Sequence, residues 1–190
     1  MEYFLLFIAA VFVNNIVLSQ FLGICPFMGV SKRLDTAYGM AASVTFVIIL
    51  STIVTFLIQS YLLDPYELQF LQTASFILVI AALVQMLEIV LKKISPPLYQ
   101  ALGVFLPLIT TNCAILGVAI LVVQKEFNLL QSVVYAASIG LGFGLALIIF
   151  AAIREQLALT KVPKGMQGAP IALIVAGILA MAFMGFSGMV

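Results

Sequence analysis

Charged residues divide this 190-residue sequence into long intervals that carry almost no charge. A helix needs about 20 apolar residues to cross a hydrocarbon core roughly 30 Å thick, and these intervals reach that length. They are continuous, whereas the strands of a membrane β-barrel would read as shorter segments of alternating character. The pattern predicts six transmembrane helices, near residues 3–30, 38–62, 68–91, 99–123, 129–153 and 168–189.

The composition also indicates a membrane protein. Hydrophobic residues make up 65% of the chain and charged residues only 8%, whereas about a quarter of a soluble domain is charged. The net charge of +1 gives no reason to expect a nucleic acid as partner. No signal peptide is recognisable, because the start lacks a basic segment and the first apolar run is too long. We therefore expect an all-α membrane protein in contact with lipid, with residues 1–190 forming a single integral membrane domain.

The basic residues predict the orientation of the helices. Cytoplasmic loops carry an excess of Lys and Arg, and seven of the eight basic residues follow the first, third and fifth spans. Both termini are therefore expected on the side opposite the cytoplasm, which for a bacterial cell means outside the inner membrane. The seven are Lys32, Arg33, Lys92, Lys93, Arg154, Lys161 and Lys164, whereas Lys125 alone lies on the other side, where short loops hold Asp64, Glu67 and Glu126.

Six spans divide into two groups of three, which must run in opposite senses. Cys25-Pro26-Phe27-Met28-Gly29 in the first span matches Cys113-Ala114-Ile115-Leu116-Gly117 in the fourth, and these are the only two cysteines. The pattern predicts two inverted repeats, of about residues 1–94 and 95–190. Small residues also recur in the middle helices, where close helix packing is the ordinary explanation; they are Gly39, Ala41 and Ser43, then Ala137, Gly140, Gly142 and Gly144.

Inverted repeats place their functional site near the midplane of the membrane and mark it with interrupted helices. Gly23, Pro26 and Gly29 surround the first cysteine, and Pro107 with Thr110-Thr111-Asn112 precedes the second. In continuous helices, Cys25 would lie about 10 Å from the cytoplasmic edge and Cys113 about 18 Å from the opposite edge. Bringing them together requires non-helical backbone, which a bilayer tolerates only inside protein. Spans one and four are therefore expected to be interrupted near the midplane.

Four interpretations of Cys25 and Cys113 stay open on spacing alone. They are small buried hydrophobic residues, a disulfide, a zinc site, or half of an iron–sulfur site. A disulfide is disfavoured because the midplane is shielded from oxidising enzymes. Zinc lacks ligands, because the chain has no histidine and no acid near either cysteine. Iron–sulfur clusters are held by four thiolates, so a second protein chain would have to supply the other pair.

Three stretches carry a resemblance to a known family. Residues 14–27 (NNIVLSQFLGICPF), 95–103 (SPPLYQALG) and 106–117 (LPLITTNCAILG) are similar to the A-subunit family of the Rnf complex. The E component of the sodium-pumping NADH:quinone reductase is similar too. The likeness covers the whole chain, including Arg154-Glu155 after the fifth span.

The resemblance implies a function and a cofactor. Rnf complexes move electrons between reduced ferredoxin and NAD⁺ and couple this transfer to the transport of Na⁺ or H⁺. RnfA pairs with the homologous, oppositely oriented RnfE, alongside the B, C, D and G components. The resemblance further implies that Cys25 and Cys113 are two of the four ligands of one intramembrane [2Fe–2S] cluster shared by the pair, and that the chain is active only within the complex.

Three polar residues within the spans have a structural and a functional interpretation each. Asn14 and Asn15 suit hydrogen bonding between helices, or they line an ion path. Glu88 is spaced to pair with Lys92 one turn later, or it takes part in ion coupling. A different class of function is also compatible with the repeat: a small secondary transporter with a solute site between the halves.

Overall fold

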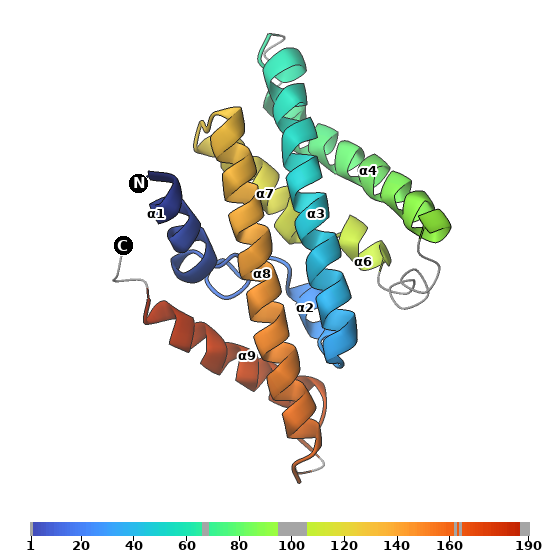
Figure 1. The fold of residues 1–190 in the computed structure, drawn as a ribbon, viewed down its shortest axis with the longest axis vertical. Coiled ribbons are helices and arrows are strands. Elements are labelled where there is room, and N and C mark those ends of the chain that lie inside the picture. The colour runs from blue at the N-terminus through green and yellow to red at the C-terminus, as the bar shows by residue number, and fades with distance from the viewer. Residues whose placement is uncertain (1, 66–68, 95–105, 162, 164, 187–190) are drawn as a thin grey trace.

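The computed structural model describes residues 2–65, 69–94, 106–161, 163 and 165–186, and every regular element in these ranges is helical (Figure 1). This agrees with the predicted all-α class. In chain order the elements are α1 (Glu2–Ile8), the π-helix η1 (Ala9–Val13), α2 (Ile24–Val30), α3 (Leu34–Ile58), the π-helix η2 (Gln59–Leu63), the 3₁₀ turn η3 (Gln69–Leu71), α4 (Gln72–Ile94), α6 (Leu106–Thr110), α7 (Cys113–Gln124), α8 (Leu129–Ala158) and α9 (Ala169–Met184).

Four helical segments are long and apolar enough to cross a membrane: Leu34–Leu63, Gln72–Val90, Pro107–Gln124 and Leu129–Ala158. They correspond to the second to fifth predicted spans. Tyr3–Val13 and Ala169–Met184 are apolar but shorter, so the count of six spans stays a prediction. The predicted start of the third and fourth spans and the end of the sixth lie outside the described residues.

Helices α3 and α8 run antiparallel through the centre of the molecule (Figure 1). They approach so closely that a Cβ added at Gly140 would lie 3.0 Å from the Cα of Thr45, and one added at Gly144 would lie 3.2 Å from the Cβ of Ala41. Small residues in membrane helices allow such backbone contact. The predicted close packing of the two middle helices is confirmed at these positions.

The first and fourth predicted spans are both interrupted. Helical structure stops after Val13 and resumes at Ile24, and in the later segment α6 and α7 are separated by Thr111 and Asn112. A break exposes backbone groups that must find other partners. In the fourth span the break lies at Thr111 and Asn112, as predicted. In the first span the break lies before Cys25 and ends at Gly23, whereas Pro26 and Gly29, which were also expected to mark it, lie inside α2.

Asn15 supplies those partners in the first break. It is fully buried, and its Oδ1 accepts the backbone N–H groups of Val17 and Leu18, at 3.1 and 3.3 Å. Its Nδ2 donates to the carbonyls of Val11 and Gly142, at 3.1 and 2.8 Å, and the second bond reaches α8. The structural interpretation of Asn15 is thus confirmed. Asn14 instead lies at the end of η1 with an exposed side chain.

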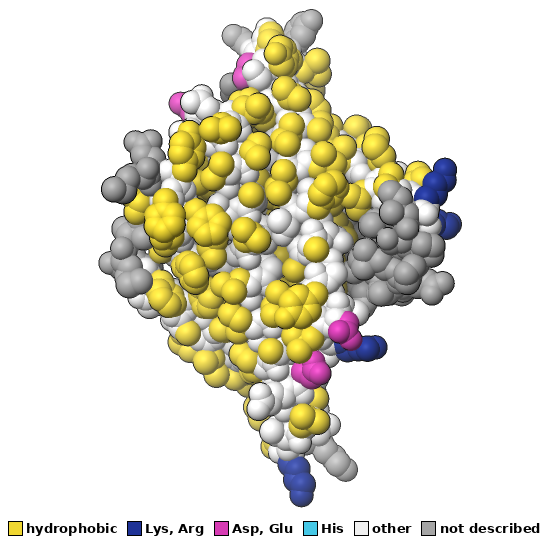
Figure 2. All heavy atoms as spheres, viewed as in Figure 1, with side chains coloured by type: hydrophobic (Ala, Val, Ile, Leu, Met, Phe, Trp, Pro, Cys, Tyr) yellow, Lys and Arg dark blue, Asp and Glu magenta, His cyan; other side chains and the backbone are white. Residues whose placement is uncertain are grey.

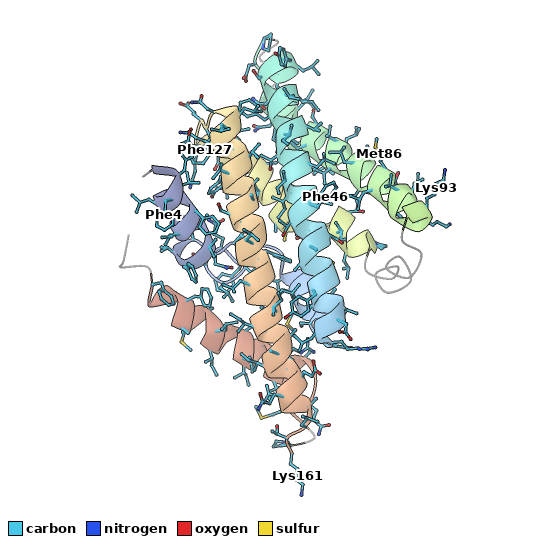
Figure 3. The ribbon with its side chains drawn as sticks, viewed as in Figure 1. Phe4, Phe46, Met86, Lys93, Phe127 and Lys161 are labelled. Atoms are coloured by element: carbon cyan, nitrogen blue, oxygen red, sulfur yellow. The ribbon has the colours of Figure 1, made fainter. Side chains whose placement is uncertain are left out.

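Polar and apolar side chains are segregated on the surface. On the face drawn in Figure 2, hydrophobic side chains cover the broad middle, and the charged ones lie at the ends and edges. Figure 3 places Phe46 on that central face, Lys161 beyond the end of α8, and Phe127 at the opposite end. A surface with an apolar belt between charged ends is what a bilayer requires of a protein that crosses it.

Candidate cysteine site at two helix interruptions

Both cysteines stand where a helix resumes after an interruption. Cys25 is the second residue of α2, and Cys113 is the first residue of α7. The backbone N–H of Gly23 donates a hydrogen bond to the Sγ of Cys113 over 2.9 Å. This bond joins residues 90 positions apart in the chain and brings the two broken segments into direct contact at Cys113.

Gly23 makes this contact possible. Its φ of +80° lies in the left-handed region, which residues with a Cβ rarely adopt. A Cβ at this position would lie 3.1 Å from the Cβ of Ala114 and 3.1 Å from Cε2 of Phe143. Only a glycine can therefore turn the chain here and also bring its N–H within bonding distance of the sulfur.

Asn112 begins α7 by capping it. Its Oδ1 accepts the N–H of Ala114 at 3.1 Å, which satisfies one of the free donors at the helix start. The side chain is 3% exposed, and its Nδ2 has no hydrogen-bond partner among the described residues. Cys113 therefore lies in the first turn of a 12-residue helix, directly after this cap.

The glycines of the two Cys-x-x-x-Gly motifs pack crosswise. A Cβ added at Gly117 would lie 2.7 Å from Cδ1 of Leu22, and one added at Gly29 would lie 3.6 Å from Cδ1 of Leu108. The glycine of each motif thus faces a leucine of the other interrupted segment. This packing gives a structural reason for the shared Cys-x-x-x-Gly motif, whose two identical residues alone are weak evidence of a repeat.

Both cysteine side chains are exposed on the surface of the chain, and both thiols are free. The interpretation of the cysteines as small buried hydrophobic residues is therefore wrong. A pair of exposed thiols in an otherwise apolar chain fits a group that is bound between this chain and a second protein. Two thiolates are half of the four that hold a [2Fe–2S] cluster, so the donor chemistry suits a shared cluster and not one held by this chain alone.

Arg154 is a residue whose role the sequence did not indicate. It was expected in the cytoplasmic loop after the fifth span, but α8 continues to Ala158, so Arg154 lies within the helix. Its Nη1 donates to the carbonyl of Met28 at 2.8 Å and to Oγ of Ser31 at 2.7 Å. A cation at the last carbonyls of a helix offsets its negative end. Arg154 thus fastens the C-terminal end of α2, and with it the cysteine segment, to α8.

The fold and the site define a polytopic, all-helical membrane protein that presents a pair of exposed cysteines from two interrupted segments. The chain belongs to the Rnf-Nqr family, since the family described as "Rnf-Nqr subunit, membrane protein" matches residues 3–190.

Three relatives show how far the similarity extends. The chain is 57% identical over 182 residues to the A component of the Na(+)-translocating ferredoxin:NAD(+) oxidoreductase complex of Acetobacterium woodii, covering 96% of this chain and 95% of the relative. It is 56% identical over 189 residues to the A component of the ion-translocating oxidoreductase complex of Pseudoalteromonas translucida, covering 100% and 98%. For the protein of the same designation in Syntrophotalea carbinolica the identity is 55% over 186 residues, covering 98% and 96%.

Proposed function

We propose that this chain is the A component, RnfA, of a membrane complex that couples electron transfer between ferredoxin and NAD⁺ to the translocation of Na⁺ or H⁺. Two observations support the proposal. Relatives that match nearly the whole chain carry the names of such components. Both thiols are free and exposed, each stands where a helix resumes after an interruption, and Cys113 accepts a hydrogen bond from Gly23 of the other interrupted segment; this arrangement is suited to binding a redox group.

The role proposed for Cys25 and Cys113 is to supply two of the four thiolate ligands of an intramembrane [2Fe–2S] cluster. When bound, such a cluster accepts and gives up one electron at a time, which divides the passage across a roughly 30 Å hydrocarbon core into shorter steps. A backbone N–H that donates to a ligand sulfur is one of the contacts that set the potential of a cluster. The bond from Gly23 to Cys113 is of this kind.

The other two ligands are proposed to come from the homologous RnfE, oriented oppositely in the membrane. The B, C, D and G components would complete the complex. The exposure of both cysteines supports this pairing, because a buried pair could not reach ligands from a neighbouring chain. A membrane thiolate is also costly without a metal to neutralise it.

The proposed topology has six spans in two inverted repeats, in a bacterial inner membrane, with both termini outside the cytoplasm. Its support is the antiparallel pair α3 and α8, one from each half, and the presence of a break in each cysteine segment. Reporter tags at both termini and in the loop after α8 test this arrangement. Finding the C-terminus in the cytoplasm would overturn it.

Replacing each cysteine tests the proposed ligands. Cys25→Ser and Cys113→Ser, introduced singly into the complex, are expected to remove the [2Fe–2S] signal from the electron paramagnetic resonance (EPR) spectrum and to abolish electron flow from ferredoxin to NAD⁺. Thr111→Ser is the matched control, since it lies in the same break and keeps the hydroxyl that donates to the carbonyl of Pro107. A cysteine variant with a normal iron signal and normal turnover would refute the assignment. A colourless chain that transports a solute when reconstituted alone would instead favour the secondary transporter.

A further inference from the structure

Helix α4 is the least covered of the four long apolar helices. Only 17% of the residues in its apolar stretch are buried, whereas the share is 39% or 61% in the other three. The helix lies at the edge of the bundle, where it contacts α3, α6 and α7 (Figure 1). Phe76, Ile80 and Val84 are buried on the side that meets these neighbours. The opposite side of α4 is therefore left without a partner in this chain, and neither cysteine lies on it.

The outward face of α4 follows a regular spacing. Its residues recur at alternating intervals of three and four, and each is exposed or half-buried: Ser75, Leu78, Ala82, Gln85, Ile89 and Lys92. Residues at these intervals lie in one row along a helix, and two helices pack through such rows at a crossing angle of about 20°. The face thus has the geometry of a helix-packing seam as well as that of a lipid-facing surface.

Gln85 distinguishes between a protein neighbour and lipid. Its side chain is exposed on the outward face, and no hydrogen bond to its amide is found among the described residues. It stands seven residues before Lys92, which is about 10 Å along the helix, so it lies within the hydrocarbon layer. Lipid chains offer an amide no hydrogen-bond partner, and leaving it unpaired there is costly. Polar side chains at this depth bond to neighbouring helices, which indicates that a helix covers Gln85.

The charged end of the same helix distinguishes between a second copy of this chain and a different protein. Lys92 and Lys93 are both exposed in the last turn of α4. Two copies would have the same orientation in one membrane, so two α4 helices packed through this face would run parallel. Both lysine pairs would then meet at one edge of the membrane, where like charges repel. A helix from a different protein need not bring basic residues to this end.

We infer that the outward face of α4 binds a membrane-spanning helix of a different subunit of the complex, and that this helix holds a hydrogen-bonding side chain level with Gln85. The amide has both donors and an acceptor, so a Ser, Thr, Asn or Gln would complete its hydrogen bonds. Ala82, three residues earlier on the same face, is small and lets another helix approach. The inference rests on the proposed function for the existence of the complex, and it adds a contact surface on a helix that carries neither cysteine.

Photo-cross-linking in cells that produce the complete complex identifies what covers this face. The photoreactive residue p-benzoylphenylalanine would replace Leu78 or Ile89, which flank Gln85 on the outward face and are 70% and 62% exposed. After irradiation, the cross-linked products would be identified by mass spectrometry. Both positions are expected to cross-link to membrane-spanning residues of one and the same subunit of the complex, and that subunit is expected to differ from this chain.

A substitution at Gln85 tests the hydrogen bond itself. Gln85→Met keeps the length of the side chain but removes its donors and acceptor, so the cross-linked subunit is expected to dissociate from the immobilised complex in detergent about threefold to tenfold faster. Met86→Leu is the matched control: Met86 is exposed beside Gln85 but is rotated about 100° around the helix, and this change should leave the rate as it is. If lipid covered Gln85, Gln85→Met would remove a polar group from hydrocarbon and would not speed dissociation.

Three results would overturn the inference. They are cross-links from Leu78 and Ile89 to a second copy of this chain, cross-links to lipid alone, and a dissociation rate in Gln85→Met no higher than in Met86→Leu. The EPR signal of the cluster is read in the same membranes. A cross-link to a different subunit in complexes without that signal would count against the proposed cluster and not against the interface. A normal signal without any such cross-link would count against the interface alone.

Discussion

Substituting Gly23 by alanine tests the geometry on which the cysteine site depends. A residue with a Cβ pays about 1–2 kcal/mol to adopt a left-handed conformation such as the φ of +80° found here. The new methyl would also lie 3.1 Å from the Cβ of Ala114 and 3.1 Å from the ring of Phe143. Neither can swing aside freely, and overpacking of this kind costs about 1–3 kcal/mol.

Together these terms predict a loss of about 3 kcal/mol, or a fall of roughly 6–12 °C in the apparent Tm of the detergent-solubilised chain. Gly177→Ala, in α9, is the control, because Gly177 has neither a positive φ nor any atom within 4 Å of an added Cβ, and it should not lower the Tm. If Gly23→Ala lowers the Tm no more than Gly177→Ala, the predicted strain and crowding at Gly23 are refuted.

Three further substitutions test contacts that hold the site. Arg154→Ala removes two hydrogen bonds to the end of α2 and should cost about 2 kcal/mol in thermal denaturation; a variant as stable as the wild type would show that this cap is unimportant. Asn15→Ala removes four hydrogen bonds to backbone groups, including those that satisfy the N–H groups of Val17 and Leu18, and should cost about 3 kcal/mol, whereas Asn14→Ala should change the Tm little. Gly140→Val would push a side chain into the backbone of Thr45, and this overpacking should cost about 3 kcal/mol. The yield of folded chain in size-exclusion chromatography should therefore fall; an unchanged elution profile and yield would contradict this.

The features that sequence reasoning found were those with a local physical signal. Runs of apolar residues predict helices because a bilayer offers the backbone no other hydrogen-bond partners. Gly23 and Asn112 predicted interruptions because glycine and asparagine favour non-helical conformations in any context. The close contact of Gly140 with α3 followed from the preference of membrane helices for small residues at crossings.

Other features depend on which segments meet in space, and the sequence does not contain that information directly. Arg154 was placed in a loop because the apolar run ends there, but its partners on α2 lie 123 and 126 residues away. The exposure of Cys25 and Cys113 could not be read from two small residues in apolar runs. The burial of Gln59 and its hydrogen bond to Asp64 gave no signal in the sequence either, since both depend on the folded arrangement of the chain.

The contact between α3 and α8 also limits how this protein can move. Gly140 lies against the Cα and the side chain of Thr45, and Gly144 lies against the methyl group of Ala41, so only small groups separate the two backbones at these positions. Side chains can change rotamer to let helices slide, but a contact without them has few alternative packings. Helices α3 and α8 should therefore move together as one rigid body, and any conformational change during turnover must occur in the segments attached to them.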